Sequence, residues 1–193
     1  MASSNPSPGG GTVSAVAGGI AAALAAMVGR LTVGRKKYAE VDTEFRALVE
    51  SAEELRARLV RLGDEDAAAY DAVSAAYGIP KTEEARRSAA IQAALLQATR
   101  VPLETLRAAR DVAALAARAA EVGNRNAVSD AGVAGLLAEA AAAGAAYNVR
   151  INVVAMPDRA TGAPLVAEAA ALLEGARQDA ARAAVAVENA IGG

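Results

Sequence analysis

The sequence contains no cysteine and no histidine among its 193 residues. Without cysteine the chain has no disulfide, no thiolate metal site and no thiol nucleophile, and without histidine it lacks the usual general base and the commonest metal ligand. Aromatic residues make up only 3% of the chain, so the core has to be built from close contacts between small side chains instead of large rings. Any chemistry therefore falls to Asp, Glu, Lys, Tyr, Ser or the backbone.

Basic and acidic residues nearly balance, because 20 Lys and Arg stand against 22 Asp and Glu and the formal net charge is -2. The basic residues are scattered along the chain, so we expect no nucleic-acid partner. The uncharged segment 12–29 raises a membrane alternative. It has no basic residue before it, contains Gly18 and Gly19, and is shorter than the ~20 strongly apolar residues of a comfortable span. We interpret it as a buried core helix, and we expect no membrane partner and a cytoplasmic protein.

Glycine and proline divide the chain into about six expected helices. These helices cover residues 12–33, 41–77, 82–100, 102–122, 129 or 130–156, and 164–189. A turn is expected at Gly34 and a left-handed helix stop at Gly123. The β-branched run 149–154 would suit a strand, but the helical pattern before it continues in phase. With no repeat and no linker, we predict an all-α, single-domain bundle of about six helices over residues 1–193.

Three glycines, Gly9, Gly10 and Gly11, stand directly before the first expected helix and follow two prolines. Glycine leaves bare backbone there, so the free amides of the first helical turn can meet an anionic or carbonyl-bearing ligand. A tight packing turn between helices would explain the same run equally well. Both interpretations stay open at this point.

In the second expected helix, a carboxylate occupies a position of the apolar stripe where a leucine is expected. The inward stripe advances by three and four residues from Phe45 to Leu62, its next step falls on Asp66, and it then resumes as far as Tyr77. Asp64 and Glu65 fall off the stripe and are most simply solvated. Asp66 is either a buried polar residue paired with an Arg or an amide, or a partly desolvated carboxyl suited to passing a proton.

A second set of polar residues follows the fifth expected helix. Counting back from Val154 in helical steps places Asp130 on the inward seam of this helix, with Asn148 and Asn152 beside it on one face. One interpretation is that Asp130 is only an N-cap and that the two asparagines bond to each other. Buried polar groups on one face also mark functional sites. The turn that contains Asn124 supplies further amides before Asp130.

Five ordered segments resemble the cyclodeaminase/cyclohydrolase family. They are residues 6–11 (PSPGGG), 31–38 (LTVGRKKY), 64–70 (DEDAAAY), 123–131 (GNRNAVSDA) and 148–152 (NVRIN). The resemblance covers roughly residues 5–158, and the last expected helix matches weakly. Relatives usually carry another helix before the glycine turn, so we expect any difference there to affect stability or the dimer contact more than the chemistry.

The resemblance implies a helical, dimeric folate enzyme without metal and without a bound cofactor, acting on a tetrahydrofolate derivative. We expect a methenyltetrahydrofolate cyclohydrolase, with formiminotetrahydrofolate cyclodeaminase as the alternative and a non-catalytic helical scaffold as a third possibility. Alanine stripes on exposed helix faces also permit close packing in a two-fold dimer. The expected catalytic residues are Asp66 and Asp130. The expected substrate-binding residues are Gly9, Gly10, Gly11, Asn124, Asn148 and Asn152 for the pterin or amidinium region, and Arg35, Lys36 and Lys37 for the glutamate carboxylates.

Overall fold

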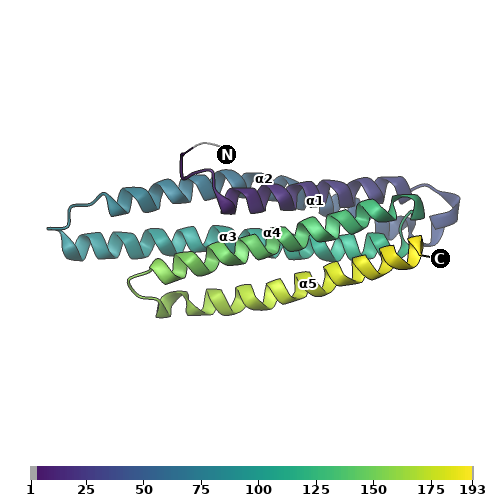
Figure 1. Ribbon diagram of the computed structural model, residues 1–193. Coiled ribbons are helices and arrows are strands. Elements are labelled where there is room, and N and C mark those ends of the chain that lie inside the picture. Colours follow the sequence, from purple (N-terminus) through teal and green to yellow (C-terminus); the bar gives the residue numbers. More distant parts are fainter. Residues whose placement is uncertain (1–3, 193) are drawn as a thin grey trace.

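The computed structural model describes residues 4–192, which form a long bundle of five α-helices lying side by side (Figure 1). No strand occurs within these described residues. The α-helices are α1 (Gly10–Thr32), α2 (Asp42–Tyr77), α3 (Glu84–Val122), α4 (Val128–Ala155) and α5 (Ala163–Ile191). Three short 3-10 helices, η1 (Lys36–Val41), η2 (Arg125–Ala127) and η3 (Ala160–Gly162), lie in the connections. The all-α prediction is confirmed.

The predicted number of helices was one too high, because the expected helices 82–100 and 102–122 are one continuous helix, α3. Pro102 lies inside it and has no N–H to donate to the carbonyl of Ala98, four residues earlier. The amide nitrogen Nδ2 of Asn152, from α4, donates a hydrogen bond to that carbonyl at 2.8 Å. A side chain from a neighbouring helix therefore replaces the missing backbone donor, and the helix continues through the proline.

Of the two glycine conformations predicted from the sequence, one is confirmed and one is wrong. Gly34 has φ 75°, the left-handed conformation expected of a glycine turn. Gly123 does not: its φ of -78° and ψ of -169° are extended, so the predicted left-handed stop was wrong. A Cβ at Gly123 would lie 2.4 Å from the carbonyl oxygen of Ala119, so close approach of the backbone explains this glycine. Asp130 lies in the first turn of α4 and is not its N-cap.

Alanine dominates the core, as the composition predicted. Residues Ala21, Ala109, Ala113 and Ala142 are fully buried in the largest cluster, where small side chains let neighbouring helices approach closely. Among the described residues, α1 is the helix that is long and apolar enough to cross a membrane by length and composition. Of its most apolar window, 56% is buried inside the bundle, which also fits a core helix.

The predicted inward face of α4 is wrong. Val133, Tyr147, Ile151 and Val154 are 46%, 64%, 62% and 53% exposed. The buried face is instead formed mainly by alanines: Ala131, Ala134, Ala138, Ala141, Ala142, Ala145 and Ala146, with Val149 and Val153. Apolar residues surround this helix on all sides, so periodicity alone does not single out one face. The smaller residues pack inward because they allow the closer helix contact.

The exposed side of α4 belongs to a larger apolar surface. On α1, Val13, Val16, Ile20, Met27 and Leu31 are also exposed, between 37% and 52%. We call the exposed apolar residues of α1 and α4 the outer apolar stripe. The two helices pack against each other, and no Asp, Glu, Lys or Arg interrupts α1 between residues 10 and 29. Contiguous exposed apolar surface of this kind marks interaction sites.

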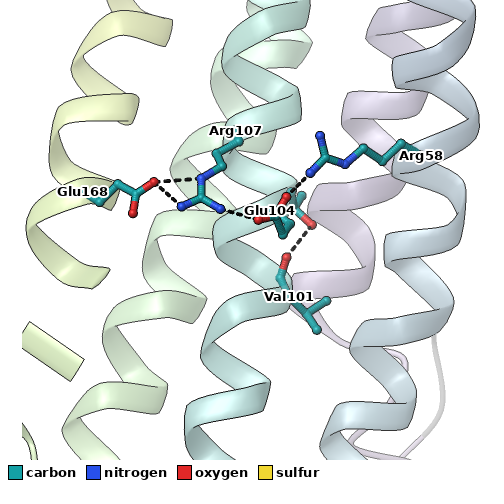
Figure 2. Close-up of polar contacts among 6 residues, drawn as sticks. Arg58, Val101, Glu104, Arg107 and Glu168 are labelled. Carbon is teal, nitrogen blue, oxygen red and sulfur yellow. Dashed lines mark hydrogen bonds and ion pairs between the residues drawn. The ribbon is translucent and has the colours of Figure 1, made fainter. Parts of the chain in front are cut away.

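A chain of charged residues connects α2, α3 and α5 (Figure 2). Glu104 of α3 accepts from Arg58 of α2 and from Arg107, one turn further along α3. Arg107 Nε in turn donates to Glu168 of α5 at 2.7 Å. These side chains are about one third exposed, so each pair is worth little alone. Together they fix the relative positions of three helices.

Candidate active site

A cleft of about 360 Å³ opens where α1 begins, between the C-terminal halves of α2 and α4 and the N-terminal half of α3. Among the described residues that line it, Asp66 is the only charged one. Six of the residues predicted from the sequence come together in this cleft, namely Gly9, Gly10, Gly11, Asp66, Asn148 and Asn152. The stripe argument for α2 is thereby confirmed: Asp66 faces the cleft, whereas Asp64 and Glu65 are exposed on the surface.

The carboxylate of Asp66 lies against the first turn of α1. Thr12 Oγ1 donates a hydrogen bond to Asp66 Oδ2 at 2.9 Å. A Cβ added at Gly11 would lie 2.1 Å from Asp66 Oδ1 and 2.6 Å from its Cγ, so glycine is needed here for space. The positive end of the α1 dipole also favours an anion at this place. Gly9, Gly10 and Gly11 therefore line the cleft, and Gly11 also leaves the space that the Asp66 carboxylate occupies.

Asn148 and Asn152 line the cleft but do not bond to each other. Asn148 Nδ2 donates to the carbonyl of Gly144, one turn earlier in α4, at 2.8 Å. Asn152 Nδ2 donates to Ala98, as described above. Each side-chain carbonyl oxygen remains as an acceptor for a ligand. The alternative in which the two asparagines satisfy each other does not apply, because both amides donate to backbone carbonyls.

Sequence reasoning missed three contributors to this site. Tyr70, one helical turn beyond Asp66, lines the cleft, and Thr12 supports the carboxylate. Tyr77 was placed on the inward stripe of α2 as a core residue, yet it is 44% exposed and lines the cleft. The spacing of Asp66, Tyr70 and Tyr77 at i, i+4 and i+11 on one helix face was the signal that could have found both tyrosines. Aromatic walls of this kind suit flat ring systems.

Five predicted residues lie at the other end of the bundle. We call them the far-end residues: Arg35, Lys36, Lys37, Asn124 and Asp130. Along α1, Gly11 and Thr32 are separated by ~32 Å at 1.5 Å per residue, and Arg35 lies beyond the end of that helix. Along α4, Asp130 and Asn148 are separated by ~27 Å. Within one chain the far-end residues therefore do not share a cleft with Asp66.

The hydrogen bonds at this end of the bundle hold the connections between helices together. Asn124 donates through Nδ2 to the carbonyl of Leu31 at 2.8 Å, and its N–H donates to Thr32 Oγ1 at 3.0 Å. At the same end, the Gly34 amide and then Arg46 hold the pKa of Asp42 below its ordinary value by hydrogen bonding to its carboxylate. These bonds join the end of α1 to the loop before α4.

A larger, more open groove of about 710 Å³ lies between α3, η2 and the C-terminal half of α5. Its charged side chains are already engaged: Arg182 pairs with Glu121 and Asp179, and Arg125 donates to the carbonyl of Ala190. The cleft at Asp66 is smaller but brings a seated carboxylate, amide groups and aromatic walls together. Within residues 4–192 no group of three or more Asp or Glu side chains is arranged to hold a metal ion.

Comparison with known proteins identifies relatives over most of the chain. The model of the formiminotransferase-cyclodeaminase family matches residues 1–171. A methenyltetrahydrofolate cyclohydrolase from Methylorubrum extorquens is 46% identical over 184 residues, which is 90% of this chain and 88% of that protein. The formimidoyltransferase-cyclodeaminase of Rattus norvegicus is 37% identical over 154 residues, 78% of this chain and 28% of that longer protein.

The fold has a solved counterpart as well. A formiminotetrahydrofolate cyclodeaminase from Thermotoga maritima superposes with a TM-score of 0.85 at 33% sequence identity, covering 98% of this chain and 92% of that one. Sequence and structure thus point to the same group of proteins.

Proposed function

This chain belongs to the formiminotransferase-cyclodeaminase family, and we propose that it hydrolyses methenyltetrahydrofolate to formyltetrahydrofolate at the Asp66 cleft. The observation that carries this proposal is Asp66 itself, the single charged side chain among the described residues that line the cleft, held between Thr12 and Gly11. The substrate is a cyclic amidinium cation. A carboxylate beside it stabilises that charge and is also a base for the attacking water.

The reaction can be written with Asp66 as the only proton carrier. Water adds to the methenyl carbon, forming a C–O bond, while one water proton passes to the Asp66 carboxylate. The resulting carboxylic acid returns that proton to a ring nitrogen as the C–N bond breaks. The hydroxyl proton of the intermediate leaves to solvent as the formyl C=O forms. A cationic substrate thus becomes a neutral formyl group, with one proton released.

The other cleft residues have binding roles in this proposal. The backbone of Gly9, Gly10 and Gly11 and the acceptor oxygens of Asn148 and Asn152 face the pterin or the amidinium region. Gly10 lies close to Asn148, because a Cβ on it would be 3.5 Å from Asn148 Nδ2. These groups line one wall of the cleft and offer hydrogen bonds to the nitrogen-rich ring.

A formiminotetrahydrofolate cyclodeaminase is the second candidate, because the Thermotoga maritima relative with that activity in its name matches 98% of this chain. That reaction closes the same ring and expels ammonia, so it needs the same carboxylate. The greater identity to the stand-alone cyclohydrolase, 46% against 33%, favours hydrolysis. A non-catalytic scaffold would leave the seated Asp66 unexplained.

We also propose a cytoplasmic homodimer that packs through the outer apolar stripe. A two-fold axis perpendicular to α1 would make the two copies antiparallel. The far-end residues of one copy would then lie beside the α1 start of the other. Under this arrangement Asp130 and Asn124 would remain candidates for a site that the second copy completes.

The test is an assay of the purified protein on both substrates. Decay of the ultraviolet band of methenyltetrahydrofolate faster than in buffer supports the cyclohydrolase. If that band does not decay faster, while formiminotetrahydrofolate is converted with ammonia release, the chain is a cyclodeaminase. Absence of both activities would reject the folate enzyme in favour of the scaffold.

A further inference from the structure

The Asp66 cleft has no cation of its own among the described residues that line it. A folate, however, ends in a glutamate whose carboxylates need positive partners. Along α2 the cleft extends from Asp66 to Tyr77, which is ~16 Å at 1.5 Å per residue. This distance leaves room for an aromatic ring and an amide beyond the reacting carbon. The positive side chains that bind the tail carboxylates therefore have to lie near Tyr77, at the end of the bundle where α2 ends.

A cation lies at that point. The guanidinium of Arg87 lies over the ring of Tyr77, 5.5 Å from its centre. Two backbone carbonyls hold it there: Nε donates to Ile79 at 3.1 Å and Nη2 to Tyr77 at 3.4 Å. Among residues 4–192, Arg87 has no carboxylate within ion-pair distance. It is thus a positioned cation with capacity left for an anion.

Lys81 lies beside Arg87. Both line a second hollow of about 350 Å³, together with Glu84, Ser88, Ile91 and Pro157. This hollow lies one helical turn from the Asp66 cleft along α3, since Ile91 lines the hollow and Leu95 lines the cleft. The two cations outnumber the single carboxylate of Glu84. Neighbouring Arg86 is different: it is 72% exposed and paired with Glu83.

We propose that Lys81 and Arg87 form the subsite for the anionic tail of the substrate, entered over the ring of Tyr77. The subsite binds a dicarboxylate such as a terminal glutamate, with Arg87 as the fixed contact and Lys81 as the mobile one. This proposal rests on the proposed folate substrate. It places the tail within the same chain as Asp66, whereas Arg35, Lys36 and Lys37 could serve the cleft only from a second copy.

The experiment compares methenyltetrahydrofolate with the corresponding methenyltetrahydropteroate, which lacks the glutamate. In the double variant Lys81→Gln/Arg87→Gln, KM for the complete substrate should rise about tenfold or more with kcat nearly unchanged, since two charge contacts are lost without touching the reacting atoms. Turnover of the tail-less substrate should equal that of the wild-type protein. The matched control Arg86→Gln should change neither substrate.

Three results would overturn the subsite. An equal loss on both substrates would show that the double variant damages the cleft generally. Unchanged KM for the complete substrate would show that the pair does not bind the tail. A tail-dependent rise in KM for Lys36→Gln/Lys37→Gln, with Lys81→Gln/Arg87→Gln unaffected, would assign the tail to a second copy.

A second measurement separates this inference from the proposed reaction. Wild-type protein that converts neither folate substrate would reject the proposed function. Binding of p-aminobenzoylglutamate, followed by NMR, then decides the subsite independently of turnover. Binding that is weakened in the double variant but not in Arg86→Gln supports the subsite, and equal binding by all three proteins contradicts it.

Discussion

Thr12 Oγ1 donates a hydrogen bond to Asp66 Oδ2 at 2.9 Å, across the contact between α1 and α2. Thr12 does not line the cleft, whereas Asp66 does. The threonine therefore holds one carboxylate oxygen from outside the cleft, while the other oxygen, Oδ1, lies against Gly11. The orientation of the proposed acid/base group is set in part by a residue that does not line the cleft.

Replacing Thr12 by valine keeps the shape of the side chain and removes the donor. We expect kcat to fall by about 10- to 100-fold with little change in KM, because a misplaced catalytic group loses rate more than binding. Thr12→Ser should keep most of the activity. In an Asp66→Asn background, Thr12→Val should cause no further loss. Additive losses in steady-state kinetics would instead indicate a general structural role for Thr12.

Gly11→Ala tests the seat of the carboxylate by crowding. Because the new methyl group would lie 2.1 Å from Asp66 Oδ1, the carboxylate must move, and we expect kcat to fall by about 100-fold. Gly19→Ala on the same helix is the control, since its Cβ would meet no atom closer than 3.9 Å. That variant should keep its activity and its melting temperature. Full activity in Gly11→Ala would mean that the seat of Asp66 does not matter.

The sequence allowed the site on α2 to be predicted, because that helix alternates clearly between apolar and polar faces. Asp66 interrupts a stripe of buried residues such as Phe45 and Leu59, so the direction of its side chain followed from the helical spacing alone. On α4 the same argument gave the wrong face. On α4, the distance to the neighbouring helices decides whether alanines or larger apolar residues face inward. The sequence of one helix does not reveal that distance.

Contacts between distant segments also escaped prediction. Pro102 suggested a helix boundary, and only the position of Asn152 on another helix explains why α3 continues. The far-end residues were grouped with Asp66 because they lie in segments that resemble the same family. The length of α1 and α4 separates them in space, and that separation depends on both helices being uninterrupted.

The bond between Asn152 and Ala98 predicts a dependence on Pro102. Asn152→Leu leaves the Ala98 carbonyl buried without a donor and should lower the free energy of unfolding by about 1–3 kcal/mol. In a Pro102→Ala background, residue 102 supplies its own N–H, so Asn152→Leu should cost markedly less. Urea unfolding of the four proteins measures this coupling. Equal costs in both backgrounds would show that Asn152 does not compensate for the proline.

Because the proposed dimer packs through the outer apolar stripe, a charge introduced into that stripe should dissociate it. Ile20 is 52% exposed in the middle of α1, so Ile20→Glu would bury a charge at a two-fold contact and should release monomers at micromolar concentration. Val185→Glu, at a 60% exposed position on α5 outside the stripe, is the control and should stay dimeric. Light scattering distinguishes the two. A wild-type protein that is monomeric and fully active would refute the dimer.

The most direct measurement is the turnover of methenyltetrahydrofolate by Asp66→Asn beside Asp64→Asn, under identical conditions. Asp66→Asn keeps the shape of the side chain but removes the transferable proton, so kcat should fall by about two to four orders of magnitude while binding weakens much less. Asp64 is exposed on the neighbouring face of α2, and its amide variant should retain most of the wild-type rate. An active Asp66→Asn protein would contradict the assignment, as would an inactive Asp64→Asn protein.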